Sequence, residues 1–254
     1  MLLAVGVPFL YVHFIEGQAP AKLSLPKSTT GSSSIAATGS TSNSVEGIWN
    51  VGAGSVVGYR VQEVLIGQQS TAVGRTSKVW GAITISGASV TKGSFTVNMA
   101  SVVSDQSQRN AQFDGRIMDV STYPTATLVL TSPIDLGTVP TDGITKQLPA
   151  SGNLTMHGVT KPVSFTVSAE RTSKTIYVLA DIPIVFADWN IANPSTGGFV
   201  TTQSSGTLEV LLHLTQSAGN AATTNPSGNS GSGGGGGPVT VPSTTVPPLS
   251  VPSN

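Results

Sequence analysis

The sequence predicts an all-β protein in which about eight antiparallel strands close into a barrel, with one short helical segment near residues 105–118. Three observations predict it. Apolar and polar residues alternate with period two over most of 47–216, the pattern of strands with one buried face. No strand–helix–strand rhythm accompanies this pattern, so an antiparallel sheet is expected. A barrel is favoured over a sandwich because closure removes exposed strand edges.

Several stretches carry the alternation clearly. In "VVGYRVQ", for example, Val57, Tyr59 and Val61 fall on one face of the expected strand. Gly87 and Gly158 lie between or beside such runs, where tight turns require positive φ angles. The expected strands cover residues 56–62, 79–85, 94–99, 163–169, 175–184 and 207–214.

Only residues 105–120 break the strand period. They contain good helix formers, begin at Asp105 and reach a helix-stopping glycine at Gly115. Tyr123-Pro124 then returns the chain to extended form, because proline disfavours helical conformation in the residue before it. We expect one short helix or a few helical turns in this stretch.

The two ends of the chain differ in composition from the expected barrel domain at 47–216. Residues 1–16 are almost entirely apolar and predict a membrane anchor, or a signal peptide cleaved near "APA" at 19–21. We favour the anchor because no basic residue precedes the apolar run. Residues 17–46 predict a flexible linker and residues 217–254 a disordered Gly/Pro/Ser/Thr tail. Either interpretation of the N-terminus places the barrel outside the cytoplasmic membrane.

The composition excludes several classes of function. Lys and Arg number 12, as do Asp and Glu, so no net charge attracts nucleic acid. The absence of cysteine excludes disulfides, thiolate nucleophiles and zinc–sulfur or iron–sulfur sites. No phosphate loop, dinucleotide fingerprint or nucleophile elbow occurs. The sequence therefore predicts no metal, no cofactor and no nucleic-acid partner.

His157 is the histidine most open to a catalytic interpretation. His157-Gly158 lies between the strand-like stretches "GNLTM" and "TKPVSFTV", where a hairpin must reverse and glycine supplies a positive φ. A metal site needs further ligands at suitable spacing, and His213 lies next to no acidic motif. We interpret His157 as a hairpin corner rather than a catalytic residue.

Charged residues gather in the helical stretch: Asp105, Arg109, Asp114, Arg116 and Asp119. They are able to form an acid–base site, but helices commonly carry such solvated charges in i,i+4 pairs. We interpret them as structural.

Several motifs together resemble the YceI-like family. "GNLTMHGVTKPV" at 152–163 is similar to the family's G-x-L-T-x-H-G-x-T-x-x-V signature. Further motifs follow in the family's order and extend the likeness over nearly all of 47–216. They are "GIWNV" at 47–51, "VVGYRVQEV" at 56–64, "VWGAITI" at 79–85, the segment 109–130 and "ADWNI" at 187–191.

The resemblance implies a lipocalin-like eight-stranded antiparallel barrel that holds a long isoprenoid or fatty chain, without catalysis. "YVHFIEGQAPAKLSLP" is similar to the membrane-proximal segment of actinobacterial members, which implies anchoring to the membrane. The sequence departs from the family at four positions that bear on recognition of a polar head group. Gln112 replaces a histidine, Asn110 an acid, Phe186 an arginine and Asn190 a glycine.

A lipid in the lumen needs space, broad apolar contacts and a polar group near the mouth. Gly58, Gly81 and Ala82 are expected to leave space. The expected apolar contacts are Tyr59, Trp80, Phe95, Ile117, Met118, Trp189 and Phe199. The expected polar groups at the mouth are Arg109, Arg116 and Tyr123.

We therefore expect non-catalytic binding, sequestration or transport of an apolar lipid, with the N-terminal segment keeping the barrel at the membrane. The lipid class is a polyisoprenoid, an isoprenoid quinone or a fatty chain. A structural or adhesive cell-envelope module with a filled barrel is the alternative. An enzyme acting on the bound lipid would need convergent polar groups deep inside, and exposed Asp188 and Arg116 would argue against it. The sequence does not set the oligomeric state.

Overall fold

The computed structural model describes residues 19–26, 44–139, 142–172, 174–195, 198 and 200–217. The expected anchor at 1–16 and nearly all of the expected tail lie outside these residues, as does Phe199. Within them, no helix has the length and apolar character needed to cross a bilayer.

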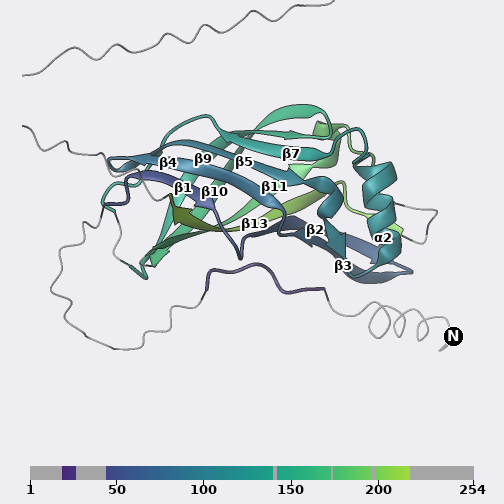
Figure 1. Cartoon of the computed structure of the whole chain (residues 1–254). Coiled ribbons are helices and arrows are strands. Elements are labelled where there is room, and N and C mark those ends of the chain that lie inside the picture. The colour runs from purple at the N-terminus through teal and green to yellow at the C-terminus, as the bar shows by residue number, and fades with distance from the viewer. Residues whose placement is uncertain are drawn as a thin grey trace, which may run out of the picture. The chain divides into compact units, whose positions relative to one another are not determined.

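The described chain forms a closed antiparallel barrel of eight strands with one short helix, which confirms the predicted fold (Figure 1). The ring closes because β13 pairs with β11 on one side and with β1 on the other. In order around the ring, its strands are β1 (Gly47–Val51), β4 (Val79–Ser86), β5 (Ser89–Asn98), β7 (Thr125–Leu130), β9 (Thr145–Met156), β10 (Val159–Thr172), β11 (Thr175–Val185) and β13 (Ser205–Gln216).

Two further strands lengthen the barrel wall. β2 (Val56–Leu65) follows β1, and β3 (Gln68–Thr76) precedes β4. β2 pairs with β3, as β1 pairs with β4, in registers that differ by one residue. Residues 47–65 and 68–86 therefore act as one long, interrupted hairpin. Short strands complete the edges: β6 (Val103–Ser104), β8 (Ile134–Asp135) and β12 (Val200–Thr202).

The hairpin predicted at His157 is confirmed. Met156 pairs with Val159, which leaves His157 (φ 50°) and Gly158 (φ 74°) as the turn. Positive φ at both central residues is the geometry of a type I′ turn, which matches the twist of the flanking strands. His157 Nδ1 lies 3.1 Å from the backbone oxygen of Trp189, and its ring packs edge-on against Tyr123. These contacts are structural.

The helical stretch lies where it was predicted, but it does not stop at glycine. Helix α2 spans Ser107–Gln112, and a π-helical turn, η3, continues over Phe113–Ile117 through Gly115. The backbone N–H of Met118 donates to the carbonyl of Phe113, five residues back, which closes this wider turn. The chain reverses later, at Asp119, whose φ is 40°.

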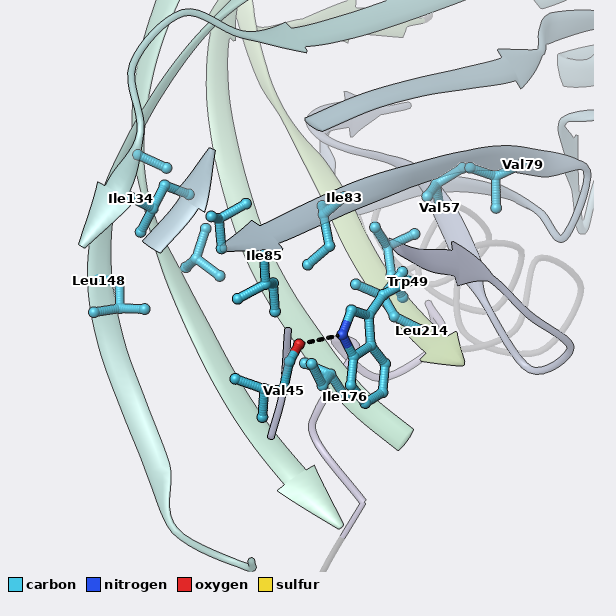
Figure 2. Close-up of a cluster of buried hydrophobic side chains, with 14 residues drawn as sticks. Val45, Trp49, Val57, Val79, Ile83, Ile85, Ile134, Leu148, Ile176 and Leu214 are labelled. Atoms are coloured by element: carbon cyan, nitrogen blue, oxygen red, sulfur yellow. Dashed lines mark hydrogen bonds between the residues drawn. The ribbon is translucent and has the colours of Figure 1, made fainter. Parts of the chain in front are cut away.

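Buried side chains form two apolar clusters inside the barrel. The first lies around Trp49, whose Nε1 donates to the backbone oxygen of Val45 at 2.7 Å (Figure 2). The second lies toward the helix and includes Phe113, Met118 and Trp189. Val45 is only 4% exposed, so the barrel core includes a residue that we expected in the flexible linker.

A second part of the expected linker also contacts the barrel. Residues 19–26, here called the strap, run along the outside of the barrel near β2 and β13 (Figure 1). Arg60 Nη2 donates to the carbonyl of Pro20 at 2.7 Å, and Arg75 Nη2 donates to the carbonyl of Ala21 at 2.5 Å. Lys22 Nζ of the strap also lies 3.4 Å from Asp181 Oδ2. The linker prediction missed the strap because its hydrogen bonds to Arg60 and Arg75 use backbone carbonyls, which any sequence provides.

Candidate ligand-binding site

The barrel encloses a cavity of about 300 Å³. Its lining runs through both apolar clusters, from Ile85 and Ile134 in the first to Phe113, Met118 and Ile191 in the second. Ligand pockets in proteins typically measure about 300–1,000 Å³, so the volume is at the lower end of that range. The interior is therefore not filled by the protein's own side chains.

Small side chains on the inner faces of the strands create the space. The period-two alternation turns one side chain of each pair inward, and several inward positions carry no large group. Gly58 was predicted to have this role and borders the cavity with its backbone, but a Cβ there would point at Arg75 and the Gly74 carbonyl on the outer face. Gly81 and Ala82 do not line the cavity. The small inward residues that line it are Ala72, Ala126, Ala169, Ala180 and Gly206.

Half of the predicted site residues line the cavity: Tyr59, Phe95, Arg109, Ile117 and Met118. Tyr59 stacks on Phe113 with ring centroids 5.2 Å apart, and this pair forms part of the wall beside the helix. Phe113 was not predicted. Its place in the helical stretch hid it, because the alternation that identifies inward residues of strands does not apply there.

Trp80 does not line the cavity, which corrects the prediction. Its side chain is 50% exposed on β4. Val79 and Ile83 of the same strand are buried and face the cavity. Since successive side chains of a strand point to opposite faces, the alternation that places these two residues inside places Trp80 outside.

Trp189, Tyr123 and Arg116 also lie outside the cavity lining. Trp189 is buried in the barrel wall, where its Nε1 donates to the backbone oxygen of Leu154 at 3.2 Å. Tyr123 packs on the His157 turn. Arg116 is exposed, and its Nη2 donates to the carbonyl of Pro194 at 3.1 Å. Of the three polar groups that we expected at the mouth of the cavity, only Arg109 lines the cavity.

The end of the cavity beside the helix carries a paired set of charges. Glu63 follows Val61 on the inner face of β2, and Arg109 Nη2 reaches its Oε1 at 3.0 Å. Arg109 Nη1 also binds Asp105 Oδ1 at 2.6 Å, the i,i+4 pairing expected for this stretch. Burial raises the pKa of Tyr59 to about 12, while the nearby Arg109 acts in the opposite direction. The Tyr59 hydroxyl is thus neutral at physiological pH.

The other end of the cavity carries Lys146, which sequence reasoning missed. Its Nζ donates to the backbone oxygens of Leu136 and, at 3.3 Å, of Thr138. Nearby, Arg171 Nε binds Asp142 Oδ1 at 2.7 Å, and Thr145 donates to Glu170. The signal was present in "TKQLPASGNLTM", where Lys146 is the first member of an inward series. That series continues with Leu148, Ala150, Gly152, Leu154 and Met156.

The departures from the family motifs have local structural roles. Asn110 Oδ1 accepts from the backbone N–H of Ser104 at 2.7 Å, and Gln112 Oε1 accepts from Arg116 Nε at 2.9 Å. Asn190 has a φ of 55°, a left-handed conformation that asparagine tolerates and glycine adopts freely. Phe186 lines the cavity as an apolar group. The described residues contain no group of His, Asp or Glu side chains placed to hold a metal ion.

The fold and the cavity define a small closed β-barrel with a ligand-sized apolar interior. A model of the YceI-like domain matches residues 49–214, and the chain belongs to this family.

Two solved structures are similar to this chain, and the first of them shares its fold. A polyisoprenoid binding domain from Saccharophagus degradans, implicated in plant cell wall breakdown, is 16% identical with a TM-score of 0.55, covering 68% of this chain and 99% of its own. BcnA of Burkholderia cenocepacia is 22% identical with a TM-score of 0.46, covering 63% of this chain and 96% of its own. No curated protein matches the chain.

Proposed function

We propose that this protein binds an apolar lipid in the barrel lumen and sequesters or transports it without chemical change. The observation that carries the proposal is the cavity of about 300 Å³ with an almost wholly apolar lining. Each methylene buried from water contributes about 0.8 kcal/mol, so a chain of about ten gains roughly 8 kcal/mol before the costs of association.

The lipid class follows from the shape and chemistry of the lining. The cavity runs through both apolar clusters, which suits a slender chain better than a compact ring system. A polyisoprenoid, the tail of an isoprenoid quinone and a fatty chain all meet this description. The Saccharophagus degradans domain is described as polyisoprenoid binding, so a prenyl chain is the first ligand to test.

A non-catalytic role is supported by the state of the charged groups at the cavity. Glu63 and Arg109 are paired with each other, and Arg171 is paired with Asp142. Asp188 and Arg116, which an enzyme of this shape was expected to bury, are both exposed. The presence of a cavity also favours a lipid carrier over a structural or adhesive module with a filled barrel.

We further propose that the barrel lies outside the cytoplasmic membrane and is anchored to it by residues 1–16. The apolar composition of that segment supports this placement. The strap begins three residues after the segment ends and is hydrogen-bonded to the barrel through Arg60 and Arg75. Such an attachment would keep the cavity close to its source of lipid.

The direct test is to extract the purified full chain with organic solvent and to identify the released lipids by mass spectrometry. A stoichiometric lipid with a prenyl or acyl chain is expected. A chain that carries no lipid after purification, and takes up neither added prenyl alcohols nor fatty acids, would contradict the proposal.

A further inference from the structure

Lys146 is placed to meet a ligand that enters the cavity. It is on the inner face of β9, two residues before the buried Leu148, and it lines the cavity. Its Nζ is held toward this end of the barrel by the carbonyls of Leu136 and Thr138. Two of the three ammonium donors are thereby used, and one is left for another acceptor.

The charges around Lys146 leave its ammonium without a carboxylate partner. Asp142 is paired with Arg171, and Glu170 accepts a hydrogen bond from the Thr145 hydroxyl. None of the ion pairs among the described residues includes Lys146. A cation beside an apolar cavity, hydrogen-bonded only to carbonyls, favours an anionic group next to it.

The opposite end of the cavity differs in this respect. Arg109 contacts the carboxylates of both Glu63 and Asp105, so its charge is already compensated by two acids. An anionic head group placed there would meet Glu63 and Asp105, two acids against the single charge of Arg109. At the Lys146 end the two acids Asp142 and Glu170 are balanced by two cations, Arg171 and Lys146. The two ends of the cavity therefore distinguish between the two orientations of an amphiphilic ligand.

We propose that Lys146 binds the anionic oxygen head group of the lipid, a carboxylate or a phosphate, while the tail extends through the cavity toward Tyr59 and Phe113. This inference rests on the proposed lipid-binding function and specifies the ligand and its orientation. The tail contacts the apolar wall along both clusters, and the head stays at the end where Lys146 and Arg171 are the nearest cations.

The test compares ligands that share one tail and differ in the head. The full chain is loaded with the neutral fluorophore N-phenyl-1-naphthylamine, which is then displaced by hexadecanoate, hexadecyl phosphate or hexadecanol. We expect the better of the two anions to bind about tenfold more tightly than the alcohol, since a charge-assisted hydrogen bond is stronger than a neutral one. The two anions separate a carboxylate preference from a phosphate preference.

Substitution of Lys146 should remove that preference. In Lys146→Met the anions should bind only as tightly as the alcohol, whose own affinity stays unchanged, and Lys146→Arg should keep the preference. Lys161→Met is the matched control, because Lys161 is an exposed residue of β10 that does not line the cavity. All variants carry the same N-terminal segment, so any binding to that segment contributes equally.

Three outcomes would overturn the inference. Equal affinity of anions and alcohol in the unmodified protein would show that the head group is not recognised. A preference that survives Lys146→Met but is lost in Arg109→Met would place the head at the helix end. Binding of none of the three ligands, and of no added prenyl alcohol, would overturn the lipid-binding proposal itself, whereas the first two outcomes leave that proposal intact.

Discussion

Glu209 and Arg60 form an ion pair on the outside of the barrel, with Arg60 Nε 2.7 Å from Glu209 Oε1 and the carboxylate side chain only 1% exposed. Arg75 Nη2 binds the other carboxylate oxygen at 2.8 Å. Gly58 pairs with both Arg75 and Glu209 in the sheet, and a Cβ there would lie 2.0 Å from the carbonyl oxygen of Gly74. Because Gly58 has no Cβ, Arg60 and Arg75 are able to bind the same carboxylate, that of Glu209, beneath the strap.

The Glu209 pair predicts a loss of stability in acid. Burial raises the pKa of Glu209, but the hydrogen bonds and charges of Arg60 and Arg75 outweigh it and hold the pKa below its ordinary value of 4.5. The stabilisation is therefore complete above that ordinary value and is lost as the pH falls through the lower, folded-state pKa. Urea unfolding at pH 7 and near pH 3 should show the loss.

Glu209→Gln supplies the comparison for that measurement. At neutral pH it should lower the free energy of unfolding by about 3 kcal/mol, because two arginines lose their shared carboxylate. Its stability should then change less between the two pH values than that of the unmodified protein. An equal change in both proteins would show that other acids cause the acid sensitivity.

The same arginines should protect the strap from proteolysis. Trypsin cleaves after lysine, and the carbonyls of Pro20 and Ala21, just before Lys22, are bound by Arg60 and Arg75. In Arg60→Met combined with Arg75→Met, we expect cleavage at Lys22 to become several times faster. Lys161→Met is the control and should leave the rate unchanged. Cleavage at the same rate in all three proteins would mean that these hydrogen bonds do not hold the strap.

The sequence was sufficient for the fold because the inner wall of the barrel consists of strands with regular alternation. The alternation in β2 directly identifies one inward face, made of Val57, Tyr59 and Val61. The His157-Gly158 turn follows from local backbone preferences. Each of these features depends on neighbours in the chain, which the sequence displays. The all-β barrel was predictable for this reason.

The site was only partly predictable because it depends on contacts between distant residues. Glu63 and Arg109 are 46 positions apart and meet only when α2 packs over β2. Residue type alone was misleading for Trp80, which is large and apolar but points outward. The role of Lys146 depends on where Leu136 and Thr138 bring their carbonyls, which no local pattern reveals.

Gly158 provides a test of the hairpin corner. Its φ of 74° disfavours any residue with a Cβ, and a Cβ there would lie 2.6 Å from Cε1 of Tyr123. Gly158→Ala should therefore cost more than the roughly 1–2 kcal/mol of a left-handed alanine alone. Gly87→Ala is the matched control, because Gly87 has a φ of 57° and nothing within 4 Å of its Cβ position. Thermal unfolding of the two variants should show a lower midpoint for Gly158→Ala.

Filling the cavity should abolish lipid binding while the barrel persists. Ala180 lines the cavity from β11 and is 4% exposed, so Ala180→Phe places an aromatic ring where the lipid chain is proposed to lie. Overpacking costs about 1–3 kcal/mol in a filled core, and the open space here should keep that cost low. Displacement of N-phenyl-1-naphthylamine should show at least a tenfold loss of affinity for a prenyl or acyl chain, with the circular dichroism spectrum of the barrel unchanged.

Trp80→Ser is the control: it removes the exposed tryptophan outside the cavity and should leave lipid affinity unaltered. If Trp80→Ser weakened binding and Ala180→Phe did not, the lipid would bind on the outer surface of the barrel instead of in its lumen.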